Sequence, residues 1–259
     1  MKVPILSDLK SKGESPEYLF WVGCAGSFDD RSKKVTKAFV KILNKANISY
    51  AILGKEESCT GDPAKRAGNE FLFQMKAIAN IEILNSYSIK NIITTCPHCF
   101  NTIKNEYPEL GGNYNVIHHT TFINNLIKEN RISIGGGFYK GKRITYHDPC
   151  YLGRANGIYE APREVIEKLD AELVEMKSCK SKSLCCGAGG AQMFKEPEKG
   201  NQDINIKRSE EAINTDSEIV AVSCPFCNTM MSDGMTSKEK NINVLDLSLI
   251  HISEPTRHH

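Results

Sequence analysis

The stretch IVAVSCPFC at residues 219–227 decides the fold, and NIITTCPHC at residues 91–99 repeats its construction. In both, a short apolar run rich in β-branched residues is typical of a buried strand. A cysteine and a proline follow, and proline is well tolerated in the first turn of a helix. Each stretch therefore predicts a strand that ends at a cysteine, with a helix beginning directly after it.

The remaining cysteines extend this similarity into an internal repeat. Cys24 lies 35 residues before Cys59 and Cys150 lies 35 residues before Cys185, so the two pairs are related by an offset of 126. The C-P-x-C pairs recur at an offset of 128, and Cys179 alone stands outside the scheme. A unit of this length is too long for a solenoid repeat, so we expect a duplicated domain.

Apolar β-rich runs alternate with helical patterns in both copies, which indicates an α/β fold with a parallel sheet covered by helices. We expect two tandem, similar parallel-sheet α/β domains at residues 17–134 and 141–247, joined near the glycines at 135–137. Expected elements include a single long helix from Pro63 to about Tyr87, and strands at 18–22, 50–53, 91–95, 143–147, 172–176 and 219–223.

Composition narrows the class of protein. The chain has 259 residues, of which 40% are hydrophobic and 25% charged, and a net charge of +2, so we expect a globular protein without a nucleic-acid partner. No apolar run approaches a membrane span and residues 1–17 lack the apolar core of a signal peptide, which predicts a cytoplasmic protein without direct membrane insertion. Residues 248–259, ending HISEPTRHH, show no periodicity, and we expect a non-native tail outside the fold.

The positions of the cysteines predict that they meet. Parallel strands end at one edge of their sheet, where ligands bind in α/β proteins. Cys59 and Cys185 fall in expected strand-to-helix loops, and the residues that follow expected strands are Cys24, Cys96, Cys150 and Cys224.

Three kinds of site use such cysteines. Tetrahedral zinc takes four thiolates and fits the first copy, Cys24, Cys59, Cys96 and Cys99. The second copy has five cysteines because Cys186 follows Cys185, which suits an iron-sulfur cluster better than a closed zinc site. The C-P-H-C sequence also imitates a thioredoxin-type site, so thiol-disulfide exchange stays open as a third alternative. His147, just before Cys150, is a candidate for delivering a proton.

These motifs resemble a known family. The motifs follow the pattern of a cysteine, about 35 residues, Cys-Cys-Gly, about 38 residues and Cys-Pro-x-Cys, taken twice. This pattern resembles the cysteine-rich CCG domain pair of heterodisulfide reductase B and D subunits. The same pair occurs in iron-sulfur subunits of glycolate, lactate and glycerol-3-phosphate oxidation systems. Stretches such as SCTGDPAKRAGNEFLFQ, HDPCYLGR and LCCGAGGAQMF are similar to the bacterial branch of heterodisulfide-reductase-related proteins.

The resemblance implies an iron-sulfur oxidoreductase subunit. In the B subunit, each complete five-cysteine motif binds a noncubane 4Fe-4S cluster, and the positions that match here are Cys150, Cys185, Cys186, Cys224 and Cys227. In the first copy Thr60 stands where the second cysteine of the pair belongs. The resemblance therefore implies an ordinary 4Fe-4S cluster or zinc at Cys24, Cys59, Cys96 and Cys99.

The resemblance also implies a partner chain. The sequence has no C-x-x-C-x-x-C-x-x-x-C-P run, so it lacks the ferredoxin-type clusters that relay single electrons. Family members carry them on an N-terminal domain or a separate subunit, sometimes membrane-bound. We expect a ferredoxin-type iron-sulfur subunit as partner, with a flavoprotein as a further candidate and peripheral membrane association through a partner. The competing class is a zinc-stabilised structural scaffold within a redox complex.

Overall fold

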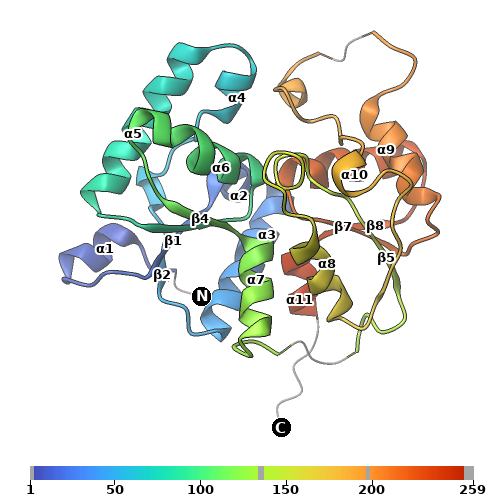
Figure 1. The fold of residues 1–259 in the computed structure, drawn as a ribbon, viewed down its shortest axis with the longest axis horizontal. Helices are drawn as coiled ribbons and strands as arrows, with labels where there is room; N and C mark the ends of the chain where they lie inside the picture. The colour runs from blue at the N-terminus through green and yellow to red at the C-terminus, as the bar shows by residue number, and fades with distance from the viewer. Residues whose placement is uncertain (1–2, 134–136, 197–198, 254–259) are drawn as a thin grey trace. The chain divides into compact units, whose positions relative to one another are not determined.

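The computed structural model describes residues 3–133, 137–196 and 199–253. The chain divides into two compact units, Met1–Phe122 and Ile123–His259, each of which contains one four-stranded sheet (Figure 1). The expected linker at residues 135–137 falls largely on positions outside the described residues. Among the residues that are described, no helix is both long enough and apolar enough to cross a bilayer.

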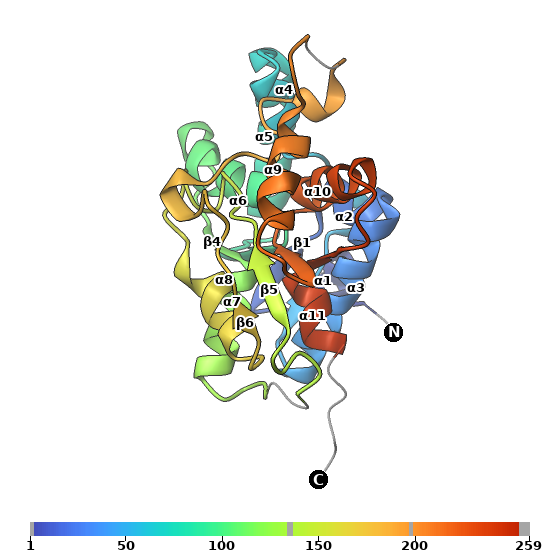
Figure 2. The same ribbon diagram turned by 90° about the vertical axis from the view of Figure 1, so that its right-hand side faces the viewer.

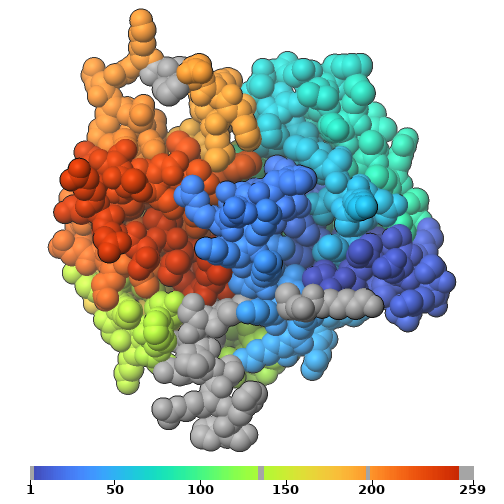
Figure 3. All heavy atoms as spheres, turned by 180° about the vertical axis from the view of Figure 1, so that it is seen from behind, coloured from blue at the N-terminus to red at the C-terminus, as the bar shows by residue number. Residues whose placement is uncertain are grey.

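In the first unit, strands alternate with helices along the chain. Its strands are β1 (Tyr18–Trp21), β2 (Tyr50–Ala51), β3 (Asn91–Thr94) and β4 (Asn115–His118). Its α-helices are α1 (Leu6–Ser11), α2 (Gly23–Phe28), α3 (Asp30–Lys45), α4 (Asp62–Arg66), α5 (Glu70–Ser86), α6 (Pro97–Asn101) and α7 (His119–Lys128), the last running on into the second unit. Short helical turns are η1 (Gly54–Glu56), η2 (Thr102–Glu106) and η3 (Tyr107–Leu110). Helix α1 lies on the surface of this unit, in dark blue in Figure 3.

The second unit repeats this plan. Its strands are β5 (Arg143–Tyr146), β6 (Glu172–Leu173), β7 (Ile219–Val222) and β8 (Asn243–Asp246). Its helices are α8 (Glu160–Glu167), α9 (Ile204–Ile213), α10 (Pro225–Ser237) and α11 (Leu247–Ser253), with short turns η4 (Lys180–Lys182) and η5 (Gln192–Phe194).

Both sheets are parallel throughout and have equivalent strand orders, β2-β1-β3-β4 and β6-β5-β7-β8. The register is equivalent as well, since Phe20 pairs with Ile93 in the first sheet and Tyr146 with Ala221 in the second. All four residues of β7 are buried, as expected for a parallel strand covered on both faces. The α/β class and the tandem duplication predicted from the sequence are therefore confirmed.

One expected helix is interrupted in the structure, and the strands expected at 50–53 and 172–176 are shorter, at Tyr50–Ala51 and Glu172–Leu173. The long helix from Pro63 to Tyr87 is broken into α4 and α5, because Gly68 adopts a left-handed φ of 84°. Asn69 then starts α5 afresh by accepting a hydrogen bond from the backbone N–H of Leu72 at 3.0 Å.

The expected tail also differs from the structure at its start. Helix α11 runs to Ser253, and Leu247 and Ile250 are fully buried, so the fold continues past residue 247. An apolar pair three residues apart suits one face of a helix, which explains why so short a segment packs. Residues 254–259 lie outside the described part of the chain. The domain boundaries expected at 17–134 and 141–247 stay a prediction.

Helices α9 and α10 lie side by side in the second unit (Figure 2). Gly234 permits their close approach, because a Cβ atom there would lie 2.9 Å from the carbonyl oxygen of Asn205 and would overlap Ser209 Oγ. The surrounding core is apolar and includes Met176, Val220 and Met231. A glycine in the middle of a helix is therefore required here by packing.

Replacing Gly234 with alanine should destabilise the protein. Alanine gains about 0.5–1 kcal/mol of helix propensity, but overpacking against α9 costs about 1–3 kcal/mol. We expect a net fall in the free energy of unfolding, measured by urea denaturation, while Ser237→Ala, at an exposed position of the same helix, changes it by less than about 0.5 kcal/mol. A Gly234→Ala protein more stable than the parent would contradict this packing.

Candidate metal centres

Five cysteines of the second unit come from three segments that meet beyond the strand ends. Cys150 follows β5, Cys185 and Cys186 lie in the loop between β6 and α9, and Cys224 and Cys227 occupy the N-cap and first turn of α10. Side-chain contacts join them in series, from Cys150 to Cys185, Cys186, Cys227 and Cys224. The sulfurs of Cys186 and Cys227 are 3.4 Å apart. We call these five residues the second-unit cysteine cluster.

The first unit has the same arrangement with one member changed. Cys24 contacts Cys59 and Cys96 contacts Cys99, and charge interactions link the two pairs. We call these four residues the first-unit cysteine cluster. Thr60 takes the place of Cys186, since its buried Oγ1 lies 4.0 Å from Cys99 Sγ. Cys24 follows β1, and it already lies in helix α2, which begins just after that strand.

A glycine shapes the loop at each cluster. Gly61 and Gly187 have φ values of 89° and 92°, a left-handed conformation that favours glycine. This conformation turns the N–H of Gly61 toward Cys59 Sγ at 3.5 Å, and the N–H of Gly187 toward Cys185 Sγ at 3.3 Å. The equivalent glycines of the two units therefore each supply a hydrogen bond to the cysteine two residues before them, Cys59 in the first unit and Cys185 in the second.

Crowding separates the pKa values of the thiols. Cys185 accepts hydrogen bonds from Cys150 and Cys186, and these bonds lower its pKa. The same bonds raise the pKa values of the two donors, that of Cys186 to about 12. In the first unit a hydrogen bond from Cys24 lowers the pKa of Cys59 to about 6, although burial opposes this. In the pairs Cys150–Cys185 and Cys24–Cys59, one thiol therefore ionises more easily and its neighbour less easily than a free cysteine. A bound cation removes this conflict, because it favours the thiolate form of every ligand.

His147 lies beside the second-unit cysteine cluster. A ring nitrogen of His147 and the sulfurs of Cys186 and Cys227 lie within 4.8 Å of one another, and all three residues are buried. His147 Nδ1 accepts a hydrogen bond from Arg208 Nε at 3.0 Å. Burial, followed by the charge of Arg208, lowers the pKa of His147 to about 3, so the imidazole is neutral at pH 7.

The segment before Cys150 is held by a buried ion pair. Arg163 donates from Nη1 and Nη2 to the two carboxylate oxygens of Asp148, at 2.8 and 2.9 Å, and both side chains are almost fully buried. Arg163 also binds Glu175 at 2.6 and 2.9 Å, and Asp148 accepts from the backbone N–H of Lys180 at 2.8 Å. This network ties the β5–Cys150 connection to the loop after β6.

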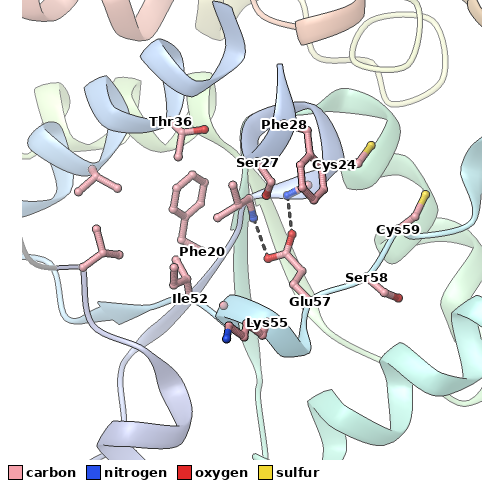
Figure 4. Close-up of a pocket in the computed structure, with 15 residues that line it drawn as sticks. Phe20, Cys24, Ser27, Phe28, Thr36, Ile52, Lys55, Glu57, Ser58 and Cys59 are labelled. Carbon is pink, nitrogen blue, oxygen red and sulfur yellow. Dashed lines mark hydrogen bonds between the residues drawn. The ribbon is translucent and has the colours of Figure 1, made fainter. Parts of the chain in front are cut away.

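The first-unit cluster adjoins a largely apolar cavity of about 560 Å³ (Figure 4). Glu57, one of its lining residues, is half-buried and accepts hydrogen bonds from the backbone N–H groups of Val22 and Gly23 at 3.0 and 2.5 Å. Burial raises the pKa of Glu57 to about 7 despite these two bonds. Glu57 thus joins the segment before Cys24 to the segment before Cys59.

A buried carboxylate, that of Asp62, supports the C-P-H-C segment. Asp62 Oδ2 lies 2.8 Å from His98 Nδ1, and Asp62 Oδ1 accepts from Arg66 Nε at 3.0 Å. Burial disfavours a charge on His98, but the hydrogen bond to Asp62 and the charge of Cys96 outweigh it and raise its pKa. Glu57 and Asp62 are polar residues that the cysteine pattern alone did not single out. Their signal is slight: each is a carboxylate within three residues of Cys59.

Comparison with known proteins gives the family. The profile of the cysteine-rich domain CCG matches residues 18–104 and 144–232, and each match contains one of the two clusters. The chain belongs to the CCG cysteine-rich domain family. The resemblance drawn from the sequence motifs is thereby confirmed.

The curated relatives that this chain matches are longer proteins. An "EtfAB:quinone oxidoreductase" from Syntrophomonas wolfei is 42% identical over 89% of this chain and 33% of its own length. The "Probable iron-sulfur-binding oxidoreductase FadF" from Bacillus subtilis is 40% identical over 97% of this chain and 35% of its own. The heterodisulfide reductase D subunit from Methanosarcina barkeri is 32% identical over 90% of this chain and 58% of its own. The chain thus spans about a third of the first two relatives.

Among solved structures, glutamate racemase RacE1 from Bacillus anthracis aligns with 91% of this chain and 79% of its own, at 12% identity and a TM-score of 0.35. That similarity is too low to bear on fold or function.

Breaking the ion pair of Arg163 should be costly in this CCG protein. Arg163→Met leaves the buried carboxylate of Asp148 without its charged partner, and we expect the free energy of unfolding to fall by about 3–5 kcal/mol. Arg163→Met combined with Asp148→Asn should recover part of this loss, because no isolated buried charge remains. Denaturant unfolding of the three proteins measures both effects. An Arg163→Met protein as stable as the parent would show that the ion pair does not hold the segment before Cys150.

Proposed function

We propose that this chain is the cysteine-rich part of an iron-sulfur oxidoreductase, of the heterodisulfide reductase-related type. It exchanges electrons between an iron-sulfur relay on a partner and a substrate or acceptor at a 4Fe-4S site in the second unit. The observation that carries this proposal is the second-unit cysteine cluster, in which five thiols from three segments are in serial contact.

The donor set fits an iron-sulfur cluster. All five cysteines are free thiols, and Cys186, Cys224 and Cys227 are buried while Cys150 and Cys185 are partly exposed. A closed tetrahedral zinc site uses four thiolates, so five in contact exceed its requirement. A cluster with several irons has positions for all five, and thiolates are its usual protein ligands. The five-cysteine set supports a noncubane 4Fe-4S cluster as its occupant.

The first-unit cysteine cluster supports a simpler site. Its four thiols equal the number that a cubane 4Fe-4S cluster or a tetrahedral zinc ion takes. Thr60 adds a hydroxyl where the second unit has the Cys186 thiol, and a neutral hydroxyl is a poor ligand beside thiolates. The redox site of the proposal is therefore the second-unit cluster.

A partner chain is part of the proposal. The sequence lacks a ferredoxin-type cysteine run, and the relatives named as oxidoreductases extend well beyond the part that this chain matches. Electrons need closely spaced carriers, so we propose a ferredoxin-type iron-sulfur partner, in some assemblies membrane-bound. The name of the Syntrophomonas relative supports an electron-transferring flavoprotein as donor and a quinone as acceptor. The activity of this chain then depends on the partner.

Cysteine replacement separates the two clusters. After anaerobic reconstitution of the full chain, Cys186→Ser should lose most of the iron of the second site and its electron paramagnetic resonance signal, because a thiolate ligand is removed. Thr60→Ala is the matched variant at the equivalent first-unit position and should keep both. Iron, zinc and acid-labile sulfide are measured for each protein.

The zinc-scaffold alternative gives a different result in the same experiment. A colourless wild-type protein that binds zinc and no sulfide would contradict the proposed function. Loss of the signal in Thr60→Ala with retention in Cys186→Ser would instead assign the redox site to the first unit.

A further inference from the structure

His147 is close enough to the second-unit cluster to act on it, and its role depends on which ring nitrogen carries the proton. Its side chain is almost fully buried, and one ring nitrogen lies within 4.8 Å of both Cys186 Sγ and Cys227 Sγ. Two roles are open on distance alone: a metal ligand through an unprotonated nitrogen, or a hydrogen-bond donor through a protonated one.

Arg208 decides between these roles. Its Nε–H donates to His147 Nδ1 at 3.0 Å, and a guanidinium has donors only, so Nδ1 must be the unprotonated nitrogen. The neutral ring then carries its proton on Nε2. A histidine that ligates a metal through Nε2 usually donates its Nδ1–H to a carboxylate or carbonyl; here the partner of Nδ1 is itself a donor. Ligation through Nε2 would place two N–H donors face to face.

Arg208 is fixed in this orientation by the rest of the second unit. Its side chain is fully buried, and Nη1 donates to the carbonyl oxygen of Ser178 at 2.7 Å and to Glu211 at 2.5 Å. Nη2 donates to Ser183 Oγ at 3.3 Å. Rotation of the guanidinium away from His147 would break all of these bonds.

The His147 Nε2–H then needs an acceptor. Nε2 is buried and has no hydrogen-bond partner within the described part of the chain. A buried N–H without an acceptor costs about 1–3 kcal/mol. Sulfur is the acceptor chemistry that the neighbouring Cys186 and Cys227 supply, and the inorganic sulfides of a bound cluster would add more.

The first unit keeps the same kind of group. Trp21 stands at the position equivalent to His147, because the two are separated by the repeat offset of 126. The strand pairing agrees: Trp21 follows Phe20 and His147 follows Tyr146, and Phe20 and Tyr146 occupy equivalent register positions in the two sheets. It is fully buried, and its indole Nε1 also finds no acceptor among the described residues. An indole nitrogen donates and does not ligate. A ring N–H is thus the property that the two copies share at this position.

We propose that His147 is not a ligand of the second-unit cluster but a hydrogen-bond donor to its sulfur atoms, and that Arg208 acts as a positioning residue by fixing the Nε2–H tautomer. The proposal rests on the proposed function for the identity of the acceptor, while the tautomer concerns the protein alone. Hydrogen bonds to cluster sulfurs stabilise the reduced state, which carries more negative charge, and raise the reduction potential.

Two matched variants test the donor role in the reconstituted full chain. His147→Phe keeps the shape of the ring and removes the N–H, whereas His147→Gln keeps an N–H donor near the position of Nε2. We expect both to retain the iron content of the wild type. His147→Phe should lower the reduction potential of the second site and lose an exchangeable proton coupling in electron-nuclear double resonance, and His147→Gln should stay close to the wild type in both.

Nitrogen labelling separates a ligand from a donor. In wild-type protein carrying ¹⁵N-histidine, we expect only a weak nitrogen coupling to the cluster spin. A strong coupling, or loss of iron in both His147 variants, would overturn the proposal and make His147 a ligand. Absence of a cluster in the wild type would contradict the proposed function instead.

The tautomer is measured without iron. The ¹⁵N chemical shifts of His147 in the full chain before iron loading, assigned by their loss in His147→Gln, should show Nε2 protonated and Nδ1 unprotonated. Arg208→Met should give a mixture of the two tautomers, and Arg208→Lys should restore the wild-type pattern in part. A wild-type ring protonated on Nδ1 would overturn the role of Arg208, whatever metal the clusters bind.

Discussion

Negative charge on crowded thiols, about half of them buried, is the constraint on which the rest of this structure depends. The sulfurs of Cys186 and Cys227 are 3.4 Å apart, and hydrogen bonding within the second-unit cluster lowers the pKa of Cys185 while it raises that of Cys150. Such a group cannot ionise fully without a cation. The surrounding residues are arranged for that charge: glycine N–H groups point at the outer cysteines, helix N-termini hold the C-P-x-C pairs, and Arg208 lies behind His147.

Much of this arrangement could be predicted from the sequence, because the cysteines and the strands share one pattern. The runs before Cys96 and Cys224 are strands, and the prolines after them begin helices. A parallel sheet then requires the strand-end residues of one copy to meet, whatever their separation in the chain. The break at Gly68 could not be predicted in this way, because a single left-handed glycine is compatible with helical periodicity on either side.

The polar residues around the clusters could not be predicted in the same way. His147 was a candidate because it precedes Cys150, but Arg208 reaches it across 61 positions of sequence and belongs to no cysteine motif. Glu57 binds backbone N–H groups, which leave no trace in the side-chain pattern of the segment that donates them. The two copies also differ at these positions: Trp21 replaces His147 and Ser183 replaces Glu57. The duplication thus places the thiols equivalently in the two units, whereas the side chains around the two clusters differ.

The occupant of the second-unit cysteine cluster can be seen in a crystal structure of the anaerobically reconstituted chain, with anomalous scattering recorded on both sides of the iron absorption edge. We expect several iron peaks among the sulfurs of Cys150, Cys185, Cys186, Cys224 and Cys227, with His147 outside the coordination sphere. A single zinc peak among four of these sulfurs, or sulfurs joined as disulfides with no metal between them, would contradict this expectation.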